Sequence, residues 1–230
     1  MRAAVIWAIK VAVGQTALAI VFLAPLAHAQ APATADPDFQ MDFSDPAMSP
    51  AQWTLTLRPD GTGHFRSNLE KPGSDKQEIG APGVDRDIQL SADYAAHVFA
   101  VAKSHKWFDE SCESHLKVAF QGWKTLSYSG PQGQGSCTFN FSKDRDIEQL
   151  GDSLVAVAVT ILEGARLELL FAHDRLGLDA EMQFLTEAAA DGRAQQIGAI
   201  RGILERLEED DSVLERVRKR ARMLLEQSAT

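Results

Sequence analysis

Alternating apolar and polar residues predict two β-hairpins in the first half of the chain. In WTLTLRPDGTGHF, residues 53–65, Trp53, Leu55 and Leu57 alternate with polar residues before a Pro-Asp-Gly turn, and Phe65 continues the apolar face after it. The segments WKTLSYS and SCTFNFS, residues 123–142, alternate in the same way around the glycine-rich GPQGQG. Proline and glycine favour tight turns, and a period of two places one set of side chains on a buried face. Cys137 shares that face with Phe139 and Phe141.

Helical spacing replaces this alternation in two places. Residues 92–108 follow Ser91, a typical N-cap, and repeat apolar side chains with a helical period. From Asp144 onward proline is absent and Leu, Ala, Glu and Arg dominate. One long helix is predicted after Asp144, with an apolar stripe from Ile147 to Ala165, and three more follow. The first of these covers residues 180–190, with Asp179 as its N-cap, and the second covers residues 194–208. The last begins at Ser212-Val213-Leu214-Glu215, which fits a capping box.

These elements predict an α+β fold: a small antiparallel sheet of two hairpins with one packed helix, followed by an α-helical C-terminal region. The predicted boundaries are 51–143 for the α+β domain and 144–230 for the helical region, a long helix plus a helical hairpin. Each amphipathic element needs a partner for its apolar side. We therefore expect the long helix after Asp144 to pack on the sheet.

The N-terminus has the pattern of a secretory signal peptide. Arg2 and Lys10 precede an apolar run, and Ala27-His28-Ala29 resembles a cleavage site, so we expect cleavage between Ala29 and Gln30. An uncleaved membrane anchor is the alternative. Residues 30–50, rich in Pro, Ala and Asp, predict a flexible linker. The alternating Phe39, Met41 and Phe43 leave a short docking strand as the alternative there.

Charge narrows the classes of partner. Without Arg2 and Lys10, 21 basic side chains stand against 32 acidic ones. An acidic protein is a poor ligand for nucleic acid or anionic lipid. We expect no nucleic acid as partner and no membrane span after removal of the signal. The sequence leaves the oligomeric state open.

The chain contains two cysteines, Cys112 and Cys137. Export favours a disulfide between them. A zinc site with His115 and His105, or two free thiols, are the alternatives. Ser114-x-x-Lys117 matches the nucleophile motif of penicillin-binding proteins, but the S-D-N and K-T-G partners of that motif do not occur. The sequence names no catalytic, cofactor-binding or metal-binding residue, and we expect no cofactor.

Two resemblances concern architecture. Residues 189–226, and VLERVRKRARMLL within them, resemble one helical pair of a HEAT repeat. The chain after the signal also resembles a family of bacterial exported proteins in which a small α+β domain leads into helices. The segments PDGTG and GPQGQGSCTFNFS carry this second resemblance. It implies an architecture and no activity.

The favoured functional hypothesis is a non-catalytic exported or envelope-associated module, periplasmic or secreted, that binds another protein. Turns, caps and core positions account for the motifs found, and short helical pairs often present a face to another chain. The alternative is a periplasmic or secreted hydrolase whose site is assembled from scattered residues. For that class the first candidates are Ser114, His115 and the Asp109-Glu110 pair.

Overall fold

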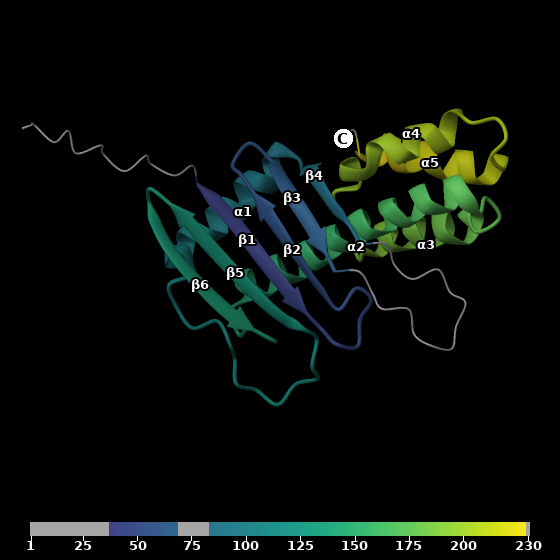
Figure 1. Ribbon diagram of the computed structural model, residues 1–230. Coiled ribbons are helices and arrows are strands. Elements are labelled where there is room, and N and C mark those ends of the chain that lie inside the picture. Colours follow the sequence, from purple (N-terminus) through teal and green to yellow (C-terminus); the bar gives the residue numbers. More distant parts are fainter. Residues whose placement is uncertain (1–36, 69–82, 229–230) are drawn as a thin grey trace, which may run out of the picture. The chain divides into compact units, whose positions relative to one another are not determined.

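The protein has an α+β fold built on one antiparallel sheet (Figure 1). The computed structural model describes residues 37–68 and 83–228. Both predicted hairpins are present, but the sheet is larger than two hairpins: six strands lie in the order β4-β3-β2-β1-β5-β6. The strands are β1 (Asp38–Ser44), β2 (Gln52–Leu57), β3 (Thr62–Ser67), β4 (Asp85–Gln89), β5 (Trp123–Gly130) and β6 (Gly133–Phe139).

The strand β1 corrects the prediction of a flexible linker over residues 30–50. Residues 38–44 lie inside the sheet, and Met41 pairs with Leu55 of β2 on one side and Leu126 of β5 on the other. Phe39, Met41 and Phe43 are buried. Pairing on both sides satisfies the backbone, and the period of two directs the apolar side chains to one face. The predicted signal peptide, its cleavage site at Ala29-Gln30 and residues 30–36 lie outside the described residues.

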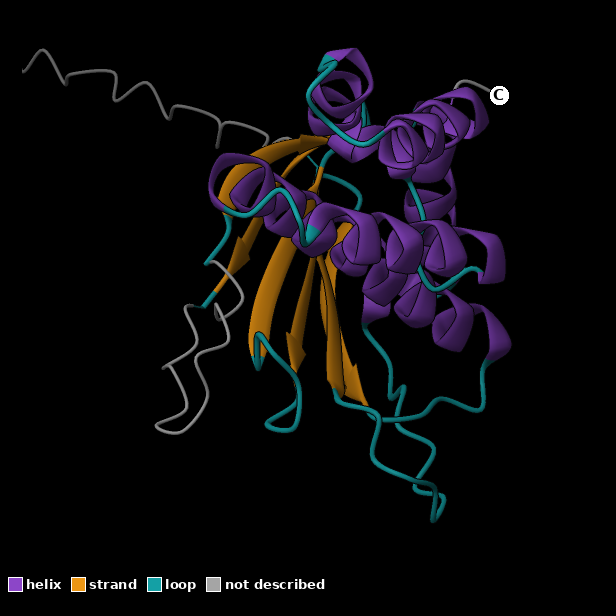
Figure 2. Ribbon diagram, turned by 90° about the vertical axis from the view of Figure 1, so that its right-hand side faces the viewer, coloured by secondary structure: helices purple, strands orange, loops and turns teal. Residues whose placement is uncertain are grey.

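Five α-helices and two short 3₁₀ helices complete the described part of the chain. Figure 2 shows α1 and α2 lying along one face of the sheet. The α-helices are α1 (Ala92–Ser104), α2 (Arg145–His173), α3 (Leu178–Asp191), α4 (Arg201–Glu209) and α5 (Glu215–Ser228). The 3₁₀ helices are η1 (Lys106–Phe108) and η2 (Ile197–Ile200). No helix in the described ranges combines the length and apolar character that a bilayer crossing requires.

Two of the predicted helix caps are confirmed. The Ser91 hydroxyl accepts a hydrogen bond from the backbone N–H of Tyr94 at the start of α1. The Asp144 carboxylate accepts from the N–H groups of Asp146 and Ile147 at the start of α2. Each cap satisfies backbone donors that the first helical turn leaves free.

Two other predicted caps are wrong. Gly177 stands at the N-cap of α3, and the carboxylate of Asp179 pairs with Arg216 and Arg220 of α5. Ser212 lies before a helix that begins only at Glu215, and its hydroxyl donates to the Asp210 carboxylate. In both cases the loop conformation and a nearby ionic partner outweigh the local signal for a cap.

The helix α2 belongs to two apolar cores. Its first part, up to Ala165, packs against α1 and the inner face of the sheet, which confirms the expected contact between long helix and sheet. Its last part, from Leu167, packs against α3, α4 and α5. The boundary between the two cores therefore lies within α2, after Ala165, and not at Asp144, where the composition of the chain changes.

Candidate interaction site: the loop held by the disulfide

The two cysteines form a disulfide. The sulfur atoms of Cys112 and Cys137 are 1.98 Å apart, and the Cα atoms are 5.7 Å apart. The favoured prediction is confirmed, and the alternatives of a thiolate zinc site or two free thiols are wrong. Cys137 lies on the buried face of β6, as its parity with Phe139 predicted. The bond thus joins the segment after α1 to the edge strand β6.

A set of polar contacts fixes the chain beyond this disulfide. The Glu113 carboxylate accepts from the backbone N–H of Asn140 at 2.7 Å and of His115 at 3.0 Å. These bonds, the Asn140 bond first, lower the pKa of Glu113. The Asn140 side chain accepts from the N–H of Gln121 at 2.7 Å and donates to the Ala119 carbonyl at 3.2 Å. Both ends of residues 115–121 are therefore bound to the chain that follows β6.

Gly122 closes this segment in a conformation that favours glycine. Its φ is +95°, and a side chain there would also meet the ring of Phe43. Glycine adopts positive φ without the steric cost that other residues carry. The turn at Gly122 leads directly into β5, whose first residue is Trp123.

We call residues 115–123 the apolar loop, because large apolar side chains are exposed along it. Leu116, Val118, Phe120 and Trp123 have exposed fractions of 50, 39, 50 and 47%. The rings of Phe120 and Trp123 meet edge to face at 5.8 Å between centroids. In Figure 1 this loop projects below β5 and β6. Exposed apolar side chains gathered on one loop mark an interaction surface more often than isolated ones do.

The residues named for a hydrolase are not assembled into a catalytic group. Ser114 is buried, and its hydroxyl accepts from the N–H of Leu116 and contacts the Glu113 carboxylate. His115 is exposed, with a positive φ of 54°. In residues 37–68 and 83–228 no hydrogen bond joins the side chains of Ser114 and His115. The Ser114-x-x-Lys117 motif lies in a loop, whereas the chemistry of penicillin-binding proteins needs its serine at the start of a helix.

The Asp109-Glu110 pair is also directed elsewhere. Glu110 lies 2.9 Å from Nδ1 of His105, and the backbone N–H of Asp109 donates to the Lys106 carbonyl. These two acidic residues thus contact the end of α1 and η1, and within residues 37–68 and 83–228 neither forms a hydrogen bond with Ser114 or His115.

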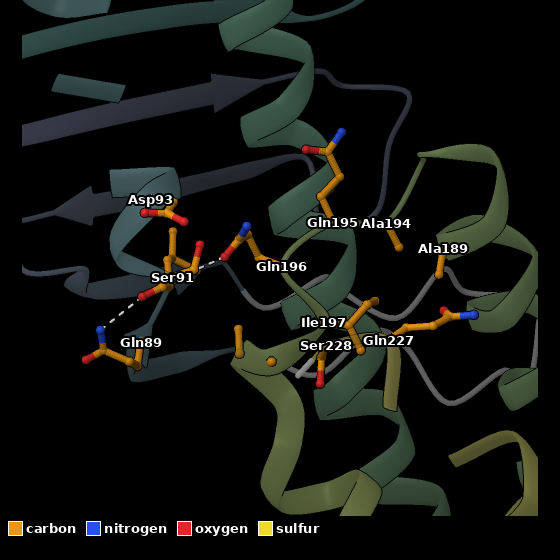
Figure 3. Close-up of a pocket in the computed structure, with 13 residues that line it drawn as sticks. Gln89, Ser91, Asp93, Ala189, Ala194, Gln195, Gln196, Ile197, Gln227 and Ser228 are labelled. Atoms are coloured by element: carbon orange, nitrogen blue, oxygen red, sulfur yellow. Dashed lines mark hydrogen bonds between the residues drawn. The ribbon is translucent and has the colours of Figure 1, made fainter. Parts of the chain in front are cut away.

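A pocket of about 600 Å³ lies where the β4–α1 junction meets η2 and the end of α5 (Figure 3). Its polar wall carries carboxamides from Gln89, Gln195 and Gln196, and Gln196 accepts from the backbone N–H of Ser91 at 2.9 Å. Leu90 and Ile197 contribute apolar surface. Among the described lining residues Asp93 is the one titratable side chain. The described part of the pocket wall thus offers a single titratable group for general acid–base chemistry.

Comparison with known proteins yields no matching family model and no matching curated protein.

Proposed function

We propose that the protein is a non-catalytic exported or envelope-associated module, periplasmic or secreted, that binds another protein through the apolar loop. The observation that carries the proposal is the exposure of Leu116, Val118, Phe120 and Trp123 on a loop that is fixed by hydrogen bonds and a disulfide. A disulfide is typical of proteins outside the reducing cytosol. The signal-type N-terminus supports the same location.

The fixed backbone matters for affinity. Ordering a flexible loop on binding costs conformational entropy, and a loop that is already held avoids part of that cost. Aromatic side chains such as Phe120 and Trp123 are enriched among residues that dominate protein interfaces. The net charge of −9 makes an anionic lipid surface a poorer partner for this loop.

Crosslinking in the native compartment tests the proposal. A photo-reactive amino acid is placed at Val118 in one variant and at Leu176, an exposed residue between α2 and α3, in the control. We expect a discrete adduct with one protein from position 118 and none from position 176. The partner, identified from the adduct, is then purified for binding measurements.

The double variant Val118→Ser, Phe120→Ser should bind that partner roughly 10 to 100-fold more weakly, the range expected for losing two interface anchors. Leu176→Ser should bind like the wild type. Equal crosslinking from both positions, or unchanged affinity of the double variant, would contradict the proposal. Hydrolysis of an ester, peptide or glycoside that Ser114→Ala abolishes would favour the hydrolase instead.

A further inference from the structure

His105 lies just after α1. One of its ring nitrogens is hydrogen-bonded to Glu110, and the other faces the carboxylates of Asp144 and Asp146. Its side chain is 12% exposed. Nδ1 is 2.9 Å from Oε1 of Glu110. An ionised carboxylate only accepts hydrogen bonds, so Nδ1 carries the proton of this contact. On the other side, Nε2 lies 3.6 Å from Oδ1 of Asp144 and 4.0 Å from Oδ2 of Asp146.

These last two distances are too long for hydrogen bonds. They suit donor atoms that share an ion, because metal–ligand bonds of about 2.0–2.2 Å hold neighbouring donors roughly 3 to 4 Å apart. One donor atom from each of His105, Asp144 and Asp146 lies within 4.8 Å of the other two. Oδ1 of Asp144 is held in place by the backbone N–H groups of Asp146 and Ile147. Asp146 is exposed, so a small rotation of its side chain can close the remaining gap.

His64 provides an internal comparison. Its Nδ1 and Nε2 lie 2.9 and 2.8 Å from the carboxylates of Asp87 and Asp85, so both nitrogens are positioned to donate. The hydrogen bond of the His64 ring to the Asp87 carboxylate is the largest of the effects that raise the pKa of His64. Both ring nitrogens of His64 are therefore engaged at hydrogen-bonding distance, which leaves neither of them open to a metal ion. His105 differs because one nitrogen contacts Glu110 at hydrogen-bonding distance while the other has room for a ligand.

We propose that His105, Asp144 and Asp146 bind a divalent transition-metal ion of the zinc class, with Glu110 positioning the imidazole. A carboxylate behind a histidine ligand fixes its tautomer and orientation in many metal sites. One imidazole nitrogen and two carboxylate oxygens suit zinc, whereas Ca²⁺ and Mg²⁺ favour oxygen donors throughout. The imidazole distinguishes this cluster from a group of surface carboxylates. This site also differs from the zinc site considered in the sequence analysis, which used Cys112 and Cys137 as ligands, because both cysteines form the disulfide.

The site would join two segments distant in sequence. His105 follows α1, while Asp144 caps α2 and Asp146 lies in the first turn of that helix. Glu110 stands two residues before Cys112, so a bound ion would also restrain the chain that leads to the apolar loop. Metal binding goes beyond the proposed protein-binding function and does not depend on it.

Zinc titration of the purified exported protein, stripped with a chelator, tests the site. We expect one Zn²⁺ per chain by calorimetry, and a Co²⁺ absorption spectrum with nitrogen and oxygen ligation. His105→Gln and Asp146→Asn should each weaken binding at least tenfold. Glu110→Gln should weaken it by roughly 10 to 100-fold, as loss of an outer-shell partner does. Zinc should raise the melting temperature of the wild type and leave that of His105→Gln unchanged.

His64→Gln is the matched control and should bind zinc like the wild type. Asp146→Asn keeps the test independent of folding, since the residue is exposed and its carboxylate is not the N-cap. Far-UV circular dichroism verifies that each variant is folded. Absence of stoichiometric binding, full binding by His105→Gln, or equal loss in His64→Gln would overturn the proposal.

Discussion

At the scale of single residues, Glu163 of α2 is the clearest case of a group whose charge conflicts with its surroundings. Its Oε2 atom is buried and has no hydrogen-bond partner among the described residues. Burial first, and then the hydrogen bond and charge of Glu181 on α3, raise the pKa of Glu163 to about 9. Arg166 opposes this shift but pairs with Glu181 at 2.7 Å. The folded protein therefore holds Glu163 in its neutral form at pH 7.

This shift makes stability depend on pH. Because the folded pKa is above the unfolded value of about 4.3, the folded state retains a proton that the unfolded state releases. The stabilisation is complete below the unfolded pKa and is lost as pH rises towards 9. Glu163→Gln mimics the neutral form, so its free energy of unfolding should fall less between pH 5 and 9. The wild type should lose at most about 1.4 kcal/mol more per pH unit than the variant.

Urea denaturation at several pH values measures both slopes. Glu187→Gln, which removes an exposed carboxylate from α3, the helix that carries Glu181, is the control and should follow the wild type. Parallel curves for wild type and Glu163→Gln would refute the assignment of a buried neutral carboxyl.

At the scale of elements, local signals predicted most of the fold and missed what depends on distant neighbours. The turn residues and the period of two predicted both hairpins, and Ser91 and Asp144 marked two helix starts. For residues 38–44 the sequence predicts a linker, because Pro and Asp dominate the flanks of this segment. Only the backbones of β2 and β5 decide that residues 38–44 form a strand.

The burial of Lys124 is a second feature that local sequence patterns do not predict. Its parity with Leu126 places it on the buried face of β5, where Nζ donates to the Asp152 carboxylate of α2 at 2.7 Å. A lysine is rarely buried unless it is paired. The partner that makes this position possible lies 28 residues away, where no local pattern indicates it.

The contact of α2 with η2 allows a prediction in which two effects have opposite sign. Gly164→Ala should gain up to about 1 kcal/mol from helix propensity. However, a Cβ atom at Gly164 would overlap the side chain of Ile200 of η2. Overpacking a core typically costs about 1–3 kcal/mol, so we expect a net loss of stability.

Gly202→Ala in α4 is the matched control, because its Cβ would meet no atom within 4 Å. It should stabilise the protein by up to about 1 kcal/mol. Thermal denaturation compares the two variants. An increase in melting temperature for both would show that η2 yields to the added methyl group.

The disulfide should hold the apolar loop as well as the fold. Replacing Cys112 and Cys137 by serine removes a link between residues separated by 25 positions. The loop-entropy model predicts a loss of roughly 3.5 kcal/mol. Trypsin cleavage after Lys117, which lies in the apolar loop, should accelerate more than cleavage at Arg201 of α4. Equal acceleration at both sites would show a global loss of stability without a specific release of the loop.

At the scale of the whole molecule, the proposed metal site consists of residues that the sequence could not bring together. His105 and Asp144 are 39 positions apart, and their proximity depends on how α1 and α2 pack against the sheet. The residues of the apolar loop are contiguous in the chain, and what the sequence did not predict there is the exposure of their side chains. The alternating Leu116, Val118 and Phe120 resemble a buried strand, and only the folded chain shows that they are exposed.

The shared helix α2 predicts that the described part of the chain unfolds in one cooperative transition. Ile147 to Ala165 belong to the sheet core and Leu167 to Leu170 to the helical core, so neither core keeps its packing if α2 unravels. The two cores carry different spectroscopic signals. Trp53, Trp107 and Trp123 all lie on the sheet side, whereas far-UV ellipticity at about 222 nm comes mainly from the helices. Urea curves followed by fluorescence and by ellipticity should therefore have the same midpoint. Separate midpoints, or limited proteolysis that yields two stable halves split near residue 144, would show that the two cores fold independently.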